Sequence, residues 1–98
     1  MSTWDDYARN AELARRDKRR RALEAEHGKP VRAGTALVIE ALARLARQDV
    51  DPAKVYGYVY RDQAAASAWQ ASTLRYNRVP SLGTVPVDGG ILGLYDLR

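Results

Sequence analysis

Cysteine and phenylalanine are absent from this chain of 98 residues, and histidine and methionine occur once each. Without cysteine the chain has no thiol for a disulfide scaffold, a thiolate zinc site, an iron–sulfur cluster or a cysteine nucleophile. His27 alone supplies too little imidazole for a His-rich metal site or a Ser-His-Asp triad. We therefore expect no bound metal, no cofactor and no catalytic residues.

Long apolar segments are missing as well. No window approaches the roughly 18 apolar residues that indicate a membrane-spanning helix, and the N-terminus lacks the apolar segment of a secretory signal. These absences favour a soluble intracellular protein that no signal peptide exports, located in the cytoplasm or in an assembled particle. We expect no membrane partner and no small-molecule substrate.

The apolar residues that are present make a thin core. Hydrophobic residues are 46% of the chain, but 16 of them are alanine and only 23 are Val, Leu, Ile, Met or Trp. A chain of this length buries a modest fraction of its surface, so a small set of large side chains provides little stabilisation. We expect the protein to depend on a protein partner or on a second copy of itself.

Residues 4–26 are predicted to form a long helix. Ser2 or Thr3 can cap its first turn, and Gly28 followed by Pro30 is typical of a helix end. An apolar seam with spacings of three and four residues runs along its first half and consists of Trp4, Tyr7, Ala11 and Ala14. The next positions in this register are basic, so the second half is expected to project or to lie on something charged.

Two further helices are predicted in the middle of the chain. Residues 35–47 carry an apolar stripe opposite a charged face. Asp51 followed by Pro52 is a typical helix start, with the aspartate as cap and the proline in the first helical position. We predict that the third helix covers residues 52–76.

The beginning of that third helix is ambiguous. An apolar repeat with spacings of four and three residues, together with the alanine-rich stretch 64–71, favours one continuous helix. Val and Tyr alternate over residues 55–60, however, and this alternation is a strand signal. The alternatives are a helix broken near residues 57–62 or a strand over 54–61.

The last segment, residues 79–98, is too rich in glycine and proline for a helix of any length. It carries nine apolar residues, so we expect an extended arm that packs on the helices or on a neighbour. A short hairpin turning at Asp88-Gly89-Gly90, which would pair residues 85–87 with 91–95, is the alternative. The predicted fold is therefore mainly α, with a small helical domain over residues 1–78 and a C-terminal arm over 79–98.

A basic run in the first helix is the strongest functional signal. Seven basic residues lie close together: Arg9, Arg15, Arg16, Lys18, Arg19, Arg20 and Arg21. They point all round the helix axis, so no core can cover them. Nucleic acid is one partner that this pattern predicts, and an acidic protein surface is another. A solvated helix with ion pairs such as Asp17 to Arg21 is the third interpretation.

Aromatic residues concentrate in the middle of the chain. On a strand, Tyr56, Tyr58 and Tyr60 would share one face and could stack on bases, but few basic residues are interleaved with them. Packing in a core or at a protein interface is therefore favoured. The side chains predicted to contact a protein partner are Trp4, Tyr7, Tyr58, Trp69, Leu82, Val85, Val87, Ile91, Leu92, Leu94, Tyr95 and Leu97.

These features favour a non-catalytic interaction or assembly subunit of a larger complex, docked through its basic helix and its C-terminal arm. A phage virion or a nucleoprotein assembly is an architectural analogy, with no motif behind it. The alternative function is a small nucleic-acid-binding regulator that acts through Arg15–Arg21. Neither function is enzymatic, because the carboxylate pairs lie at predicted helix ends or turns and no phosphate-binding glycine motif occurs.

Overall fold

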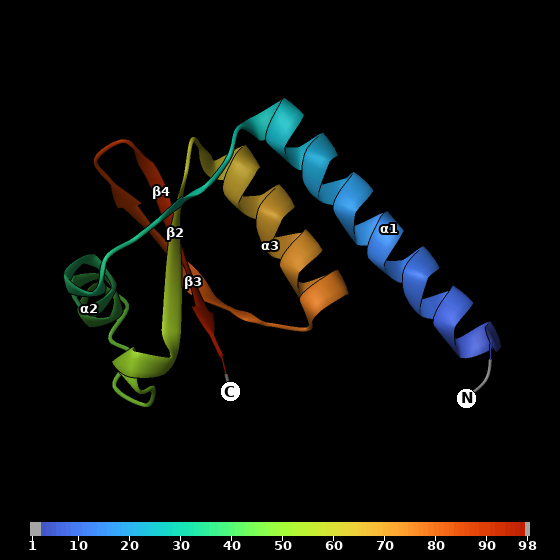
Figure 1. Ribbon diagram of the computed structural model, residues 1–98. Helices are drawn as coiled ribbons and strands as arrows, with labels where there is room; N and C mark the ends of the chain where they lie inside the picture. The colour runs from blue at the N-terminus through green and yellow to red at the C-terminus, as the bar shows by residue number, and fades with distance from the viewer. Residues whose placement is uncertain (1–2, 98) are drawn as a thin grey trace.

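The computed structural model describes residues 3–97 and has an α+β fold (Figure 1). Its elements follow one another as α1 (Thr3–His27), β1 (Val31–Arg32), α2 (Thr35–Arg44), the 3-10 turn η1 (Pro52–Lys54), β2 (Val55–Tyr60), α3 (Gln63–Asn77), β3 (Ser81–Val87) and β4 (Gly90–Asp96). The first two helices lie where the sequence predicted them. The prediction of a mainly α fold is wrong, because β2 and the C-terminal segment build an antiparallel sheet.

The sheet has the strand order β1-β2-β4-β3. β4 lies between β2 and β3, so that Ile91 is opposite Tyr60 on one side and opposite Pro86 on the other. β2 and β3 are both antiparallel to β4 and therefore run parallel to each other, with α3 as the crossover between them. β1 adds a short strand beside β2 and brings Arg32 opposite Tyr58.

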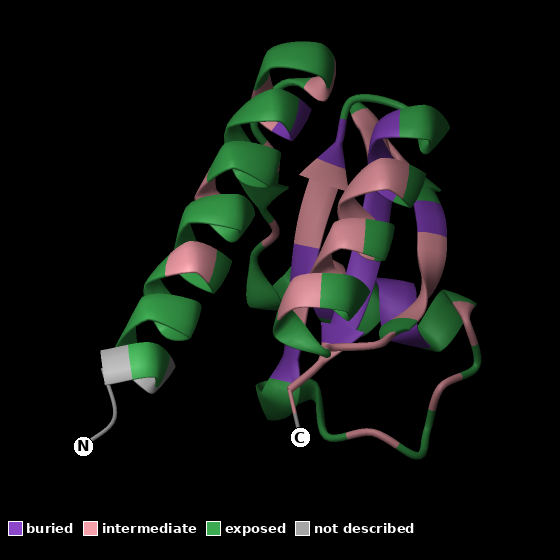
Figure 2. Ribbon diagram, turned by 90° about the vertical axis from the view of Figure 1, so that its right-hand side faces the viewer, coloured by how far each residue is buried: buried purple, intermediate pink, exposed green. Residues whose placement is uncertain are grey.

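Helices cover both faces of the sheet (Figures 1 and 2). On one face, α2 packs on a cluster that includes Val55, Leu92 and Leu94. On the other face, α3 packs on Tyr60 and Tyr95, and α1 lies against α3. Because side chains alternate along a strand, the valines of β2 face α2 and its tyrosines face α3.

The predicted extended C-terminal arm is wrong and its hairpin alternative is confirmed, because the segment forms β3 and β4, which pair across a turn at Asp88 and Gly89. Leu92 and Leu94 are fully buried, and both hydrophobic clusters combine residues from either side of position 78. Glycine and proline exclude a helix here but suit a hairpin: Gly89 and Gly90 have φ values of 87° and 151° in the turn, and β3 lies at the edge of the sheet. The core that looked too thin is completed by this segment.

The single helix predicted over residues 52–76 is also wrong. Asp51 does act as a cap, since its side chain accepts a hydrogen bond from the Ala53 N–H at 3.0 Å, but it starts only the turn η1. The alternating residues that follow form β2, as the strand alternative had it, because β4 provides a full-length partner. A second cap, Asp62, then starts α3 by accepting from the Ala65 N–H at 2.8 Å.

Candidate nucleic-acid interface

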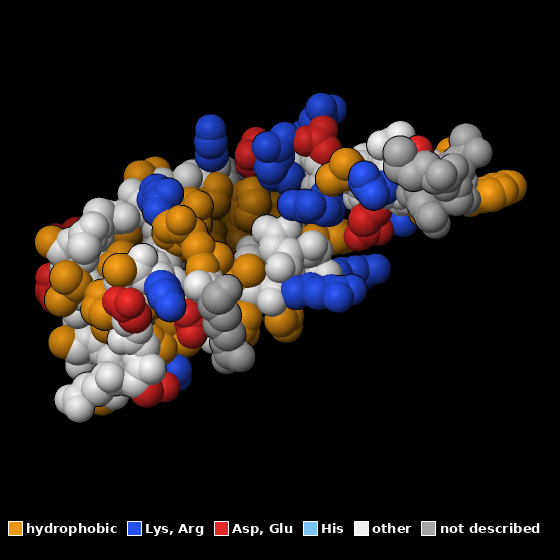
Figure 3. Space-filling view, turned by 60° about the horizontal axis from the view of Figure 1, so that its bottom comes forward, with side chains coloured by type: hydrophobic (Ala, Val, Ile, Leu, Met, Phe, Trp, Pro, Cys, Tyr) orange, Lys and Arg blue, Asp and Glu red, His pale blue; other side chains and the backbone are white. Residues whose placement is uncertain are grey.

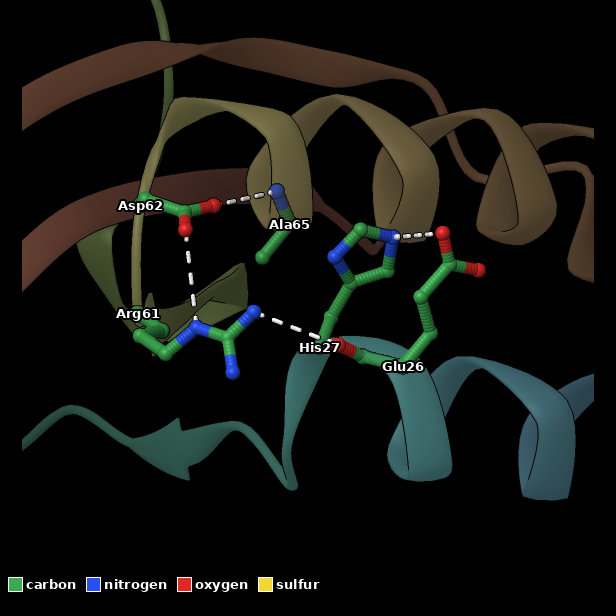
Figure 4. A network of polar contacts seen from close by, with 5 residues as sticks. All are labelled: Glu26, His27, Arg61, Asp62 and Ala65. Atoms are coloured by element: carbon green, nitrogen blue, oxygen red, sulfur yellow. Dashed lines mark hydrogen bonds and ion pairs between the residues drawn. The ribbon is translucent and has the colours of Figure 1, made fainter.

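A polar network fixes the C-terminal end of α1 to the turn between β2 and α3 (Figure 4). The Arg61 guanidinium donates to the Glu26 carbonyl oxygen at 3.2 Å and to the Asp62 carboxylate at 3.5 Å. Arg61 thus donates a hydrogen bond to a carbonyl in the last turn of α1, where a cation is favoured. The Ala65 N–H, and secondarily Arg61, holds the pKa of the Asp62 carboxyl below its ordinary value.

Beyond this anchor, α1 contacts the body through one side. Leu23 is 1% exposed, whereas Trp4 and Tyr7 are 80% and 71% exposed on the first turns of α1. Figure 1 shows these first turns running past the end of α3. The two aromatic side chains of the predicted seam are therefore largely exposed, and Leu23 marks a side of α1 that packs on the body.

The basic run of α1 is exposed to solvent (Figure 2). Arg15 pairs with Glu12 at 2.9 Å, and Arg20 and Arg21 share the carboxylate of Asp17. Among the six cations of residues 15–21, the other three, Arg16, Lys18 and Arg19, form no ion pair with another described residue. Two carboxylates cannot neutralise six cations, and exposed pairs of this kind are weak. Most of the positive charge is therefore open to a partner.

A groove lies between α1 and α3, and a hollow lies beside it at the tyrosine face of β2. The groove has a volume of about 280 Å³ and includes Leu13 and Arg16 of α1. The hollow has a volume of about 400 Å³ and is lined by Tyr56 and Tyr58. Figure 3 shows a hollow with hydrophobic side chains in its depth and Lys and Arg side chains around it. Four residues line both spaces, so the two are neighbours: Arg20, Trp69, Thr73 and Asn77.

Tyrosines form the floor of the hollow. The Tyr60 and Tyr95 hydroxyls lie 2.5 Å apart in a buried hydrogen bond, and burial raises the pKa of both. The Tyr58 ring meets Tyr95 edge-on, with ring centroids 6.4 Å apart. Both buried hydroxyls are therefore neutral at physiological pH. The rings of Tyr56 and Tyr58 are half-buried and form the accessible part of the floor.

Cations and one orphaned donor border this aromatic surface. Arg20 and Lys29 line the hollow, and the Arg32 guanidinium lies 4.0 Å from the centre of the Tyr56 ring. The indole Nε1–H of Trp69 is buried and has no acceptor among the described residues. The site therefore combines aromatic faces, positive charge and a hydrogen-bond donor that lacks a partner.

The structure separates the side chains predicted for a protein interface into three groups. Trp4 and Tyr7 are exposed, and Tyr58 and Trp69 belong to the hollow. The others lie in the sheet or next to it, packed on the two hydrophobic clusters or lining the hollow: Leu82, Val85, Val87, Ile91, Leu92, Leu94, Tyr95 and Leu97. The sequence reasoning missed Lys29 and Arg32, whose nearness to the tyrosines depends on the pairing of β1 with β2.

Between residues 3 and 97, no three His, Asp or Glu side chains converge as metal ligands would. Within the same residues, no helix is both long enough and apolar enough to cross a membrane. Comparison with protein-family models finds no match to the chain, and comparisons with curated proteins and with solved structures find none either. Function is therefore inferred from the geometry of the site.

Proposed function

We propose that the protein is a non-catalytic nucleic-acid-binding protein and that α1 is its main contact. The observation that carries this proposal is the exposed basic run, in which Arg16, Lys18 and Arg19 have no ion-pair partner among the described residues. Cations in such a run neutralise phosphates and release counterions, which drives binding to nucleic acid of any sequence. An intracellular location is part of this proposal, since the protein must meet nucleic acid.

The way α1 is attached supports this role. Only the side marked by Leu23 packs on the body, so cations on the other sides of the helix can approach a phosphate backbone. Thirteen of the 16 basic residues of the chain are arginine, whose planar guanidinium can hold a phosphate with two hydrogen bonds. The formal net charge of +4 favours association with a polyanion.

A charge-reversal experiment tests the proposal. The triple variant Arg16→Glu, Lys18→Glu, Arg19→Glu should lose binding to fluorescently labelled oligonucleotides, measured by anisotropy over a series of salt concentrations. For the unchanged protein, log K should fall with log salt, with a slope whose magnitude is about 0.9 per phosphate neutralised on a duplex and about 0.7 on a single strand. Each of the three cations removed should lower this slope by about 1.

The matched control changes three cations elsewhere: Arg44→Glu, Arg47→Glu, Lys54→Glu. These residues lie on α2 or after it, and α2 covers the face of the sheet opposite to α1. The control has the same net charge as the test variant, so it should keep most of the affinity. Absence of binding to any oligonucleotide at low salt, or an equal loss in both variants, would overturn the proposal.

A second candidate function is an assembly subunit that docks through the first turns of α1. The observation that favours it is the exposure of Trp4 and Tyr7 where α1 runs past α3. The C-terminal segment is not available for docking in this version, because it is paired within the sheet. Light scattering should then give a mass above 10.9 kDa that returns to the monomer value in Trp4→Ala, Tyr7→Ala. A monomeric unchanged protein would count against self-assembly.

A further inference from the structure

The tyrosine face of β2 is only partly covered. Tyr60 lies beneath the first turns of α3, against Ala65 and Ala66, and is 3% exposed. Tyr56 and Tyr58 lie further from these turns, are half-buried and line the hollow. Two neighbouring aromatic rings on one strand are therefore accessible from the groove beside α1.

The charge around these rings selects the kind of ligand. Arg20 and Lys29 line the same hollow, and Arg32 stacks on Tyr56. One acidic side chain, Glu24, is also in the lining, next to the polar groups of Thr73 and Asn77. An occupant with an aromatic face, polar edges and a phosphate attached satisfies all of these groups, and a nucleotide has each of them.

The groove next to the hollow indicates where the rest of a strand would lie. Arg20 lines both spaces. Arg16, one helical turn earlier, lines the groove but not the hollow. Arg16 and Arg20 are about 6 Å apart along the helix axis at 1.5 Å per residue. A strand with one base in the hollow would thus have successive phosphates beside these two cations.

We propose that the hollow takes an unpaired base of a single-stranded nucleic acid, stacked on Tyr58, while Arg16 and Arg20 hold the neighbouring phosphates, with Arg20 exchanging its exposed ion pair with Asp17 for a phosphate. This inference rests on the proposed function and adds the substrate class. A base inside a duplex is stacked on its neighbours and cannot enter a recess between a helix and a sheet without flipping out. Trp69 lines the same hollow, and its buried indole N–H has no acceptor among the described residues.

The test compares single strands with a duplex of the same length, using the full chain and fluorescence anisotropy. Oligodeoxythymidine and oligouridine serve as the single-stranded probes, and the preference between them separates DNA from RNA. Tyr58→Ala should weaken single-strand binding by about tenfold, as expected for the loss of one stacked base, and should leave duplex binding unchanged. Tyr58→Phe keeps the aromatic ring and should retain single-strand binding. Tyr7→Ala, which removes an exposed tyrosine of α1, is the control and should also retain it.

A second measurement does not depend on a variant of the floor. Trp4→Phe leaves Trp69 as the one indole in the chain. Single strands should quench its emission, and the duplex should not. Three results together would overturn this inference and leave the proposed function standing. They are equal affinity for single strands and duplex, no effect of Tyr58→Ala on binding, and no quenching of Trp69 emission. Failure of every oligonucleotide to bind would overturn both, and Tyr58-dependent binding of polyglutamate alone would make the ligand an acidic peptide.

Discussion

The Tyr60 and Tyr95 hydroxyls lie 2.5 Å apart in a buried hydrogen bond, although the two residues are 35 positions apart in the sequence. The bond lies on the sheet face beneath α3, where Ala65 and Ala66 leave room for the two rings. It links β2 to β4 through side chains as well as through the backbone. The floor of the hollow is therefore a rigid part of the core.

This bond predicts a non-additive pair of substitutions. Tyr95→Phe should lower the free energy of unfolding by about 1–3 kcal/mol, because the Tyr60 hydroxyl stays buried without its partner, and Tyr60→Phe should cost less, because Tyr95 keeps a hydrogen bond with Thr73. The double variant should lose clearly less than the sum of the two. Urea unfolding of the four proteins measures the difference, and strictly additive losses would show that the hydroxyls are not coupled.

Alkaline pH should destabilise the fold through the same pair. Burial raises the pKa of Tyr60 and of Tyr95 above the ordinary value of 10.0, so the native state holds their protons more tightly than the unfolded state does. Their contribution is complete below pH 10, and the free energy of unfolding should fall as the pH rises above it. Spectrophotometric titration should find fewer than six tyrosines ionising before the chain unfolds. Ionisation of all six in the folded protein would contradict this.

The hairpin turn predicts different effects at two adjacent glycines. Both have positive φ, but a Cβ at Gly90 would lie 1.9 Å from the Tyr60 carbonyl oxygen, whereas a Cβ at Gly89 would meet nothing within 4 Å. Gly89→Ala should cost about 1 kcal/mol of stability from backbone strain alone. Gly90→Ala should cost about 3 kcal/mol or more, since β2 and β4 must separate. Equal midpoints in thermal unfolding would contradict this packing.

Deletion of residues 79–98 should unfold the protein. The deletion removes β3 and β4, including the buried side chains of Leu92 and Leu94, and leaves β2 with only the short strand β1. An isolated pair of strands is marginal in water, so cooperative thermal unfolding should disappear from circular dichroism. Deletion of residues 1–12, which removes the exposed side chains of Trp4 and Tyr7, is the control and should preserve cooperative unfolding. A truncated chain that still unfolds cooperatively would restore the idea of a separable arm.

The sequence predicted the elements that depend on local signals. α1 and α2 have apolar periodicity, and α1 also ends where Gly28 and Pro30 indicated. The predicted bounds of both helices differ from the observed bounds by a few residues at most. The strand at 55–60 was visible as alternation, but the start signal at Asp51 and the alanine-rich stretch outweighed it. What decides for the strand is β4, more than 30 residues later, and no local pattern contains that partner.

The candidate site was predictable only in part. The basic run was visible, because exposed charge on a helix needs no knowledge of the fold. The hollow was not, because it takes Arg20 from α1, Tyr58 from β2 and Trp69 from α3, together with the segment that carries Lys29. The stacking of Arg32 on Tyr56 likewise depends on the pairing of β1 with β2. Sequence reasoning found the charge and, in its strand alternative, the shared face of the tyrosines, but it could not place the two side by side.

We propose that the basic run of α1 and the tyrosine hollow form one interface for single-stranded nucleic acid. The most direct measurement is an amide NMR map of the isotope-labelled full chain as an unlabelled single strand is added. The backbone signals of residues 15–21 and of 56–58 and the indole signal of Trp69 should shift together, whereas those of α2 and the indole of Trp4 stay in place. Shifts confined to α2 or to β3, or no shifts at low salt, would contradict the claim.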